Sequence, residues 1–160
     1  MDKIITTEQI NELNQTLHQQ NKRIVLVGGC FDILHIGHIT FLEKAKTQGD
    51  SLIVLLESDE TITRTKGPKR PVNTLHDRAK ILSALSYVDY VITLPPLMTD
   101  KSYETLVIAL KPAIIATTSG DKNRAHKERQ ARLVQAKVVD VTPQISDKST
   151  TKLIKLLDEI

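Results

Sequence analysis

The stretch Val27-Gly28-Gly29-Cys30-Phe31-Asp32-Ile33-Leu34-His35-Ile36-Gly37-His38 combines the end of an apolar run, a glycine turn and two histidines in a dozen residues. Glycines at a strand end let a ligand approach the backbone, and the N-terminus of a following helix offers unpaired N–H groups to an anion. The stretch therefore predicts a strand, a turn and a helix that together form an anion site.

Outward from this stretch, apolar runs alternate with segments of helical periodicity. Continuous apolar runs are typical of strands that are covered on both faces of a parallel sheet. Strands are predicted at 23–27, 51–56, 90–94, 113–117 and 138–141. Helices are predicted at 7–17, 38–49, 74–86, 103–110 and 124–135, and from 149 to the C-terminus. Because the connections are short, the sequence predicts an α/β fold, a Rossmann-like three-layer sandwich with a five-stranded parallel sheet.

Length and composition limit the classes of function. The 160 residues are expected to form one domain, 1–160, with a lead-in helix within 1–20. A net charge of +3 and an aromatic content of 3% give no reason to expect nucleic-acid or membrane binding. The N-terminus has no long apolar run, and a single cysteine forms no internal disulfide, so we expect a cytoplasmic protein.

His35 and His38 are the first candidate functional residues. Three residues apart, they point to one side if the segment is helical. Imidazoles hold phosphate oxygens as charge builds in a transition state. The alternative is that one histidine caps the helix, the other packs, and the glycines only shape the turn. The strand–turn–helix context favours phosphate binding.

Residues 29–38 match the His-x-Gly-His signature without a gap, and the chain resembles the nucleotidyltransferase superfamily that carries it (cytidylyltransferase-like). The similarity extends over residues 22–121. Within it, the run Gly67-Pro68-Lys69-Arg70-Pro71 resembles bacterial heptose-1-phosphate adenylyltransferases more than glycerol-3-phosphate cytidylyltransferases, which lack such a run.

The resemblance implies roles for particular residues. The catalytic residues would be His35, His38 and Lys66, with Lys66 acting from a flexible loop at 64–71. The groups that bind the nucleotide would be Gly29, Cys30, Phe31, Gly37, Arg78, Asp121, Ser149 and Thr150. Asp121 would contact the nucleotide, cap the next helix, or do both. For Arg64, Lys69 and Arg70, phosphate binding and plain surface exposure both stay open.

The implied reaction is transfer of AMP from ATP, with Mg²⁺, to a sugar phosphate such as heptose 1-phosphate, with release of pyrophosphate. No protein ligand to the metal is predicted. Two alternatives stay open: CTP with glycerol 3-phosphate or a related alcohol phosphate, and a non-catalytic nucleotide-binding protein. The second arises because the segment before Ser149 departs from the family pattern. The expected partners are a nucleoside triphosphate, a phosphorylated small-molecule acceptor and, as in many family members, a second copy of the chain.

Overall fold

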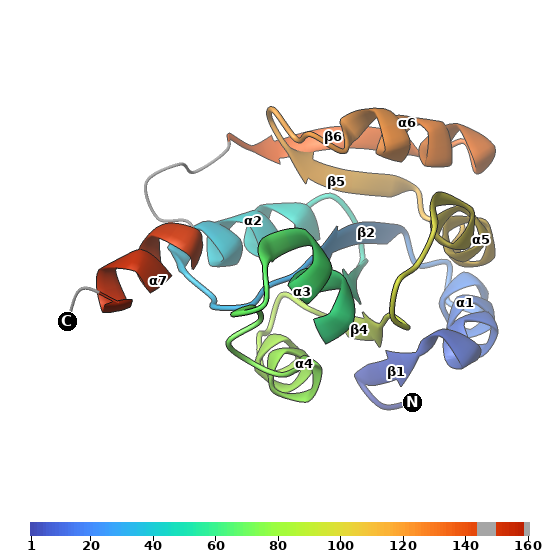
Figure 1. Ribbon diagram of the computed structural model, residues 1–160. Coiled ribbons are helices and arrows are strands. Elements are labelled where there is room, and N and C mark those ends of the chain that lie inside the picture. Colours follow the sequence, from blue (N-terminus) through green and yellow to red (C-terminus); the bar gives the residue numbers. More distant parts are fainter. Residues whose placement is uncertain (144–149, 159–160) are drawn as a thin grey trace.

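A parallel sheet forms the centre of the computed structural model, which describes residues 1–143 and 150–158 (Figure 1). Its strand order is β1-β4-β3-β2-β5-β6. The strands are β1 (Ile4–Thr6), β2 (Ile24–Gly29), β3 (Ser51–Leu56), β4 (Tyr90–Thr93), β5 (Ile114–Thr118) and β6 (Lys137–Thr142). A short 3-10 turn, Thr7–Gln9, follows β1. The helices are α1 (Ile10–Gln19), α2 (Ile36–Lys46), α3 (Asp59–Lys66), α4 (Leu75–Ser83), α5 (Asp100–Leu110), α6 (Arg124–Leu133) and α7 (Thr150–Asp158).

Both faces of the sheet are covered, as the apolar runs predict. Along β2, Ile24 and Leu26 pack in one cluster with side chains of α1, α5 and α6. Val25 and Val27 point the other way and pack with side chains of α2 and α4. The alternation follows from the two-residue period of a strand. The fold is therefore the predicted three-layer α/β sandwich.

The predicted strand count is wrong, because the described sheet has six strands and not five. The additional strand, β1, lies within the segment predicted only as a lead-in helix. It pairs in parallel with β4, and Ile5 is buried there. A strand of three residues is too short to show a period, so the sequence alone gives no signal for it.

A second correction concerns residues 64–66, which form the end of helix α3 (Asp59–Lys66) rather than the start of the predicted loop at 64–71. The Ser58 hydroxyl accepts a hydrogen bond from the Thr61 backbone N–H and caps the helix. Asp59 and Glu60 lie in the first turn, and Gly67 ends the helix with a φ of 100°. The glycine and prolines that indicated a loop therefore mark only the segment after Lys66.

The strand order places the stretch 27–38 at the topological switch point of the sheet, where the chain stops adding strands on one side of β2 and begins on the other. β2 pairs with β3 on one side and with β5 on the other. In open α/β sheets, ligands bind outside the carboxyl ends of the strands at such a reversal. The turn after Gly29 lies at this point.

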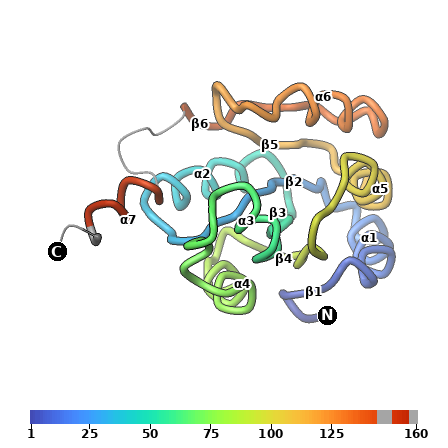
Figure 2. Tube along the Cα trace, in the orientation of Figure 1, coloured from blue at the N-terminus to red at the C-terminus, as the bar shows by residue number. Residues whose placement is uncertain are grey.

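Helix α7 approaches the same end of the sheet. The Thr150 hydroxyl donates a 3.1 Å hydrogen bond to the Ile33 carbonyl, so the first turn of α7 lies beside the start of α2 (Figure 2). Among the described helices, none combines the length and the apolar character that a membrane crossing requires.

Candidate functional site

A pocket of about 280 Å³ lies at the carboxyl ends of β2 and β5. Its walls come from the glycine turn, the first turns of α2, the end of β5 and the start of α6. It is lined by Gly28, Gly29, Cys30, Phe31, His35, Gly37, His38, Phe41, Thr117, Thr118, Asp121, Asn123, Lys127, Thr142 and Pro143. The structure thus brings together seven of the predicted site residues: Gly29, Cys30, Phe31, His35, Gly37, His38 and Asp121.

The turn after β2 is tightly built. Phe31 has a φ of 44°, a left-handed conformation that costs a non-glycine residue about 1–2 kcal/mol. A Cβ atom on Gly29 would lie 3.0 Å from the Phe31 ring. A larger residue at position 29 would push the Phe31 ring aside, so Gly29 fits the close approach of that ring. The strained residue Phe31 lies in the pocket wall.

The two histidines lie side by side. His35 is the N-cap of α2, and its Nδ1 accepts a 3.1 Å hydrogen bond from the Gly37 backbone N–H. The ring centroids of His35 and His38 are 3.9 Å apart. Both rings line the pocket. The capping alternative is thus true of His35, and it does not remove that ring from the pocket.

Burial lowers the pKa of both imidazoles and so favours their neutral form. Burial lowers the pKa of His35. Burial first, and then the charges of His35 and Lys66, lower the pKa of His38 to about 4, and the Ile33 backbone opposes this shift. Nδ1 of His38 is buried and has no hydrogen-bond partner among the described residues. A phosphate placed beside the rings would favour the protonated form, because an opposite charge stabilises it. The pair is suited to an anionic ligand.

Lys66 is the last residue of α3 and is exposed. It does not line the pocket, but its charge acts on two residues that do: it helps to lower the pKa of His38, and it offsets part of the rise that burial causes in the pKa of Cys30. Its prediction as a catalytic cation therefore depends on the long side chain reaching toward a bound ligand. The backbone of Lys66 belongs to the end of helix α3 and not to the predicted flexible loop.

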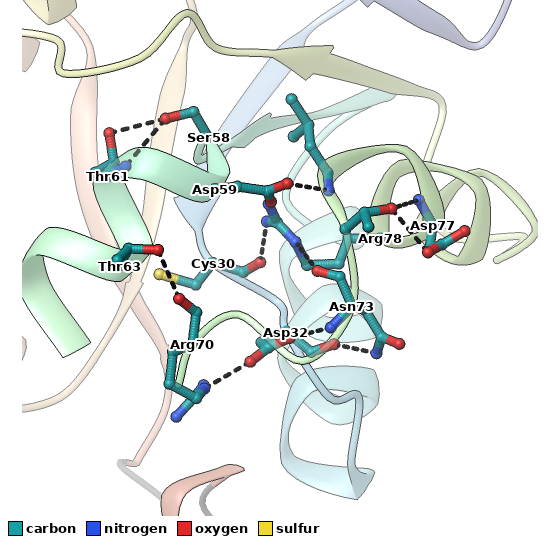
Figure 3. Close-up of polar contacts among 12 residues, drawn as sticks. Cys30, Asp32, Ser58, Asp59, Thr61, Thr63, Arg70, Asn73, Asp77 and Arg78 are labelled. Atoms are coloured by element: carbon teal, nitrogen blue, oxygen red, sulfur yellow. Dashed lines mark hydrogen bonds and ion pairs between the residues drawn. The ribbon is translucent and has the colours of Figure 1, made fainter. Parts of the chain in front are cut away.

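Arg78 lies behind the pocket and is fully buried (Figure 3). Its Nη1 donates to the Cys30 carbonyl (2.7 Å), its Nε to the Asn73 carbonyl (3.1 Å) and its Nη2 to an Asp59 carboxylate oxygen (2.6 Å). Each guanidinium nitrogen thus has an acceptor within the protein. The arrangement positions the backbone of the turn after β2.

Sequence reasoning gave no role to Asp32, and the structure shows a buried cluster around it (Figure 3). Arg70 Nε donates a 2.6 Å hydrogen bond to Asp32 Oδ2, and both side chains are buried. The backbone N–H groups of Val72 and Asn73 donate to the same carboxylate. Of the two possibilities left open for Arg70, surface exposure is wrong, because the side chain is buried and pairs with Asp32, which joins the segment after α3 to the histidine stretch. Phosphate binding by Arg70 stays a prediction.

Asp121 is held by its own neighbours at the far wall. Its Oδ2 accepts hydrogen bonds from Thr117 and Lys127, and its Oδ1 accepts one from the Asn123 N–H at the start of α6. Burial alone would raise the pKa of this carboxyl, but these hydrogen bonds outweigh burial and lower it. Lys127 of α6, which the sequence does not mark as a site residue, also lines the pocket.

The remaining candidates are Cys30 and the start of α7. Burial raises the pKa of the Cys30 thiol, which keeps it protonated and argues against a nucleophilic role. Thr150 is buried beside Ile33 rather than in the pocket lining. Ser149 lies outside the described residues.

The fold and pocket together define a class: a Rossmann-like α/β domain with a pocket at its switch point, in which two histidines form part of the lining. The chain belongs to the cytidylyltransferase-like family, which it matches over residues 26–156.

Curated relatives include the bifunctional protein HldE of Nitratiruptor sp., 40% identical over 148 residues, which are 92% of this chain and 30% of that protein. HldE of Helicobacter hepaticus is 41% identical over 153 residues, with 96% and 30% covered. The chain therefore spans about a third of the length of these relatives.

Two solved structures are similar. The lipopolysaccharide core biosynthesis protein from Thermoplasma volcanium is 29% identical, with a TM-score of 0.62 over 79% of this chain and 99% of that one. Pantoate-beta-alanine ligase from Francisella tularensis is 18% identical, with a TM-score of 0.65 over 99% of this chain and 79% of that one. The second likeness concerns the fold alone.

Proposed function

We propose that the chain transfers AMP from ATP to a sugar phosphate of the heptose 1-phosphate kind and releases pyrophosphate. The observation that carries the proposal is the close pair His35 and His38 at the start of α2, in a pocket at the switch point of the sheet. Two further findings support it: the 40% identity with HldE and the similarity to a lipopolysaccharide core biosynthesis protein.

In this proposal the protein positions charge and does not react covalently. The backbone of Gly29, Cys30 and Phe31 borders the nucleotide, and the imidazoles donate N–H groups to its phosphates. Lys66 adds a cation from the end of α3. An acceptor phosphate oxygen attacks the α-phosphorus of ATP in line, the bond to the leaving oxygen breaks, and pyrophosphate departs. Phosphoryl chemistry of this kind depends mainly on orientation and electrostatic stabilisation.

Mg²⁺ enters the proposal as part of the ATP substrate. Among the residues that the structure describes, no group of three or more His, Cys, Asp or Glu side chains is placed to hold a metal ion. Magnesium prefers phosphate oxygens and water with few protein ligands. We therefore infer that the ion arrives with the triphosphate. A cytoplasmic location and a homodimer also belong to the proposal.

The test measures pyrophosphate release with ATP and CTP, each against heptose 1-phosphate and glycerol 3-phosphate. We expect turnover with ATP and heptose 1-phosphate. Turnover only with CTP and glycerol 3-phosphate would make the chain a cytidylyltransferase, and nucleotide binding without any turnover would make it a binding protein.

A histidine variant tests whether the site carries the chemistry. Removing a preorganised donor typically lowers the rate about 100- to 1000-fold, so His38→Ala should lose nearly all pyrophosphate release and keep its fold. His18→Ala is the matched control, because His18 is exposed on α1. Full turnover in His38→Ala would refute the assignment.

A further inference from the structure

A second pocket, of about 210 Å³, lies beside the nucleotide pocket and shares Asn123 and Lys127 with it. Every side chain in its lining is polar or ionisable. The nucleotide pocket, in contrast, includes the apolar rings of Phe31 and Phe41. A small pocket without apolar side chains suits a ligand that is rich in hydroxyl groups, because each polar wall group needs a hydrogen-bond partner.

One wall of this polar pocket is the pair Glu57 and Tyr103, which comes from two distant parts of the chain. Glu57 directly follows β3, and its backbone N–H donates a 3.1 Å hydrogen bond to the Gly29 carbonyl. The Tyr103 hydroxyl, on α5, donates a 2.5 Å hydrogen bond to Glu57 Oε1. Both side chains are thereby fixed next to the turn that borders the nucleotide.

The pair has unused hydrogen-bonding capacity. Oε2 of Glu57 is buried and has no hydrogen-bond partner among the described residues. Burial also raises the pKa of this carboxyl. A buried carboxylate oxygen without a donor is unfavourable, and a ligand hydroxyl is a donor of the required kind. The Tyr103 oxygen still has lone pairs that can accept a hydrogen bond.

Lys127 lies at the boundary between the two pockets. Its ammonium group contacts Asp121 Oδ2 and lies 3.1 Å from the Thr117 hydroxyl. A ligand in the polar pocket and a nucleotide in the first pocket would bring their phosphates together at this boundary. The Lys127 cation lies beside that position.

We propose that the polar pocket binds the hydroxyl groups of the sugar-phosphate acceptor, with Glu57 and Tyr103 as the residues that select it. This inference rests on the proposed function, since it assigns the acceptor half of the same site. The sugar hydroxyls contact the Glu57 and Tyr103 pair, and the acceptor phosphate points past Lys127 toward the nucleotide.

The test uses Tyr103→Phe and Glu57→Gln, which remove a hydroxyl and a charge with little change in size. Pyrophosphate release is measured against heptose 1-phosphate at saturating ATP, and against ATP at saturating acceptor. We expect the KM for the acceptor to rise about tenfold in each variant, because Tyr103→Phe removes one hydrogen-bond acceptor and the group that holds Glu57 in place, and Glu57→Gln removes the charge of the other acceptor. The KM for ATP should stay within about twofold.

Tyr87→Phe is the matched control. The Tyr87 hydroxyl also donates to a glutamate, Glu43, but this hydrogen bond is exposed. Tyr87 precedes β4 and so lies near the amino-terminal end of that strand, away from the carboxyl ends where the pockets lie. Both KM values should be unchanged in this variant.

The outcomes separate this proposal from the proposed function. Turnover by the unaltered chain supports the proposed function. If it is accompanied by equal increases in both KM values in the variants, or by no increase, the acceptor pocket is overturned. If the unaltered chain shows no turnover, the function fails, and calorimetric titration with heptose 1-phosphate then tests the pocket. Binding that Tyr103→Phe loses supports the pocket. Absent or equal binding overturns it.

Discussion

Nη1 of Arg78 donates a 2.7 Å hydrogen bond to the carbonyl oxygen of Cys30, and this contact connects helix α4 to the turn after β2, which lines the histidine pocket. The two residues are 48 positions apart in the chain. Because the guanidinium is fully buried, its influence on a ligand is transmitted through the position of the turn.

Replacing this arginine should therefore affect stability and nucleotide binding together. In Arg78→Met, the Cys30 and Asn73 carbonyls lose a charged donor, and we expect the free energy of unfolding to fall by about 3 kcal/mol. The KM for ATP should rise as the turn loosens. Urea denaturation and pyrophosphate release measure the two effects. The control is Arg124→Met, at a half-exposed ion pair, where stability should change little. Unchanged stability in Arg78→Met would contradict the positioning role.

The Asp32–Arg70 ion pair makes a separate prediction, because removing one partner leaves a buried charge unpaired. Asp32→Asn should lower the free energy of unfolding by about 3 kcal/mol. The double variant Asp32→Asn with Arg70→Met should be less destabilised than the sum of the two single variants, since it leaves no lone charge. Chemical denaturation of all four proteins measures the coupling, and strictly additive losses would show that the two side chains do not interact.

Lys66 should matter for catalysis and not for stability, because its side chain is exposed. Loss of a cation that stabilises the transition state lowers rates by roughly 100-fold, so we expect Lys66→Ala to show that loss with an unchanged urea midpoint. Lys44→Ala, also exposed and in the last turn of α2, serves as control. Equal activity of the two variants would exclude a catalytic Lys66.

The lowered pKa of His38 makes stability depend on pH. The unfolded imidazole binds its proton near pH 6.5 and the folded one only near pH 4. Between these values the unfolded state holds more protons, so the free energy of unfolding falls as the pH falls from 6.5 toward 4. After a discount for partial exposure, we expect His38 to account for roughly 1–2 kcal/mol of this loss. Urea denaturation at pH 7 and pH 4 should show a smaller loss in His38→Asn than in the unaltered chain.

The parts of the site that sequence patterns could predict are local ones. The glycine turn, the two histidines and the strand before them lie within a dozen residues, and spacing alone places both rings on one side of a helix start. Helix α3 was also predictable, because Ser58, Asp59 and Gly67 are ordinary start and stop signals. The loop predicted at 64–71 starts three residues too early, because α3 continues to Lys66.

The parts that could not be predicted depend on distant contacts. Arg70 reaches Asp32 across 38 positions, and Tyr103 reaches Glu57 across 46. No local period marks such pairs, since each forms only when separate strands and helices meet at one edge of the sheet. Strand β1 is similar, because three residues become a strand only by pairing with β4.

The hydrogen bond from the Gly37 N–H to Nδ1 of His35 also determines the tautomer of that ring. A neutral imidazole carries one proton, and with Nδ1 accepting, the proton resides on Nε2. His35 can therefore offer an N–H to a phosphate oxygen without first gaining a proton from solvent. Because of the helix cap, His35 can donate a hydrogen bond through Nε2–H at pH values where the ring is neutral.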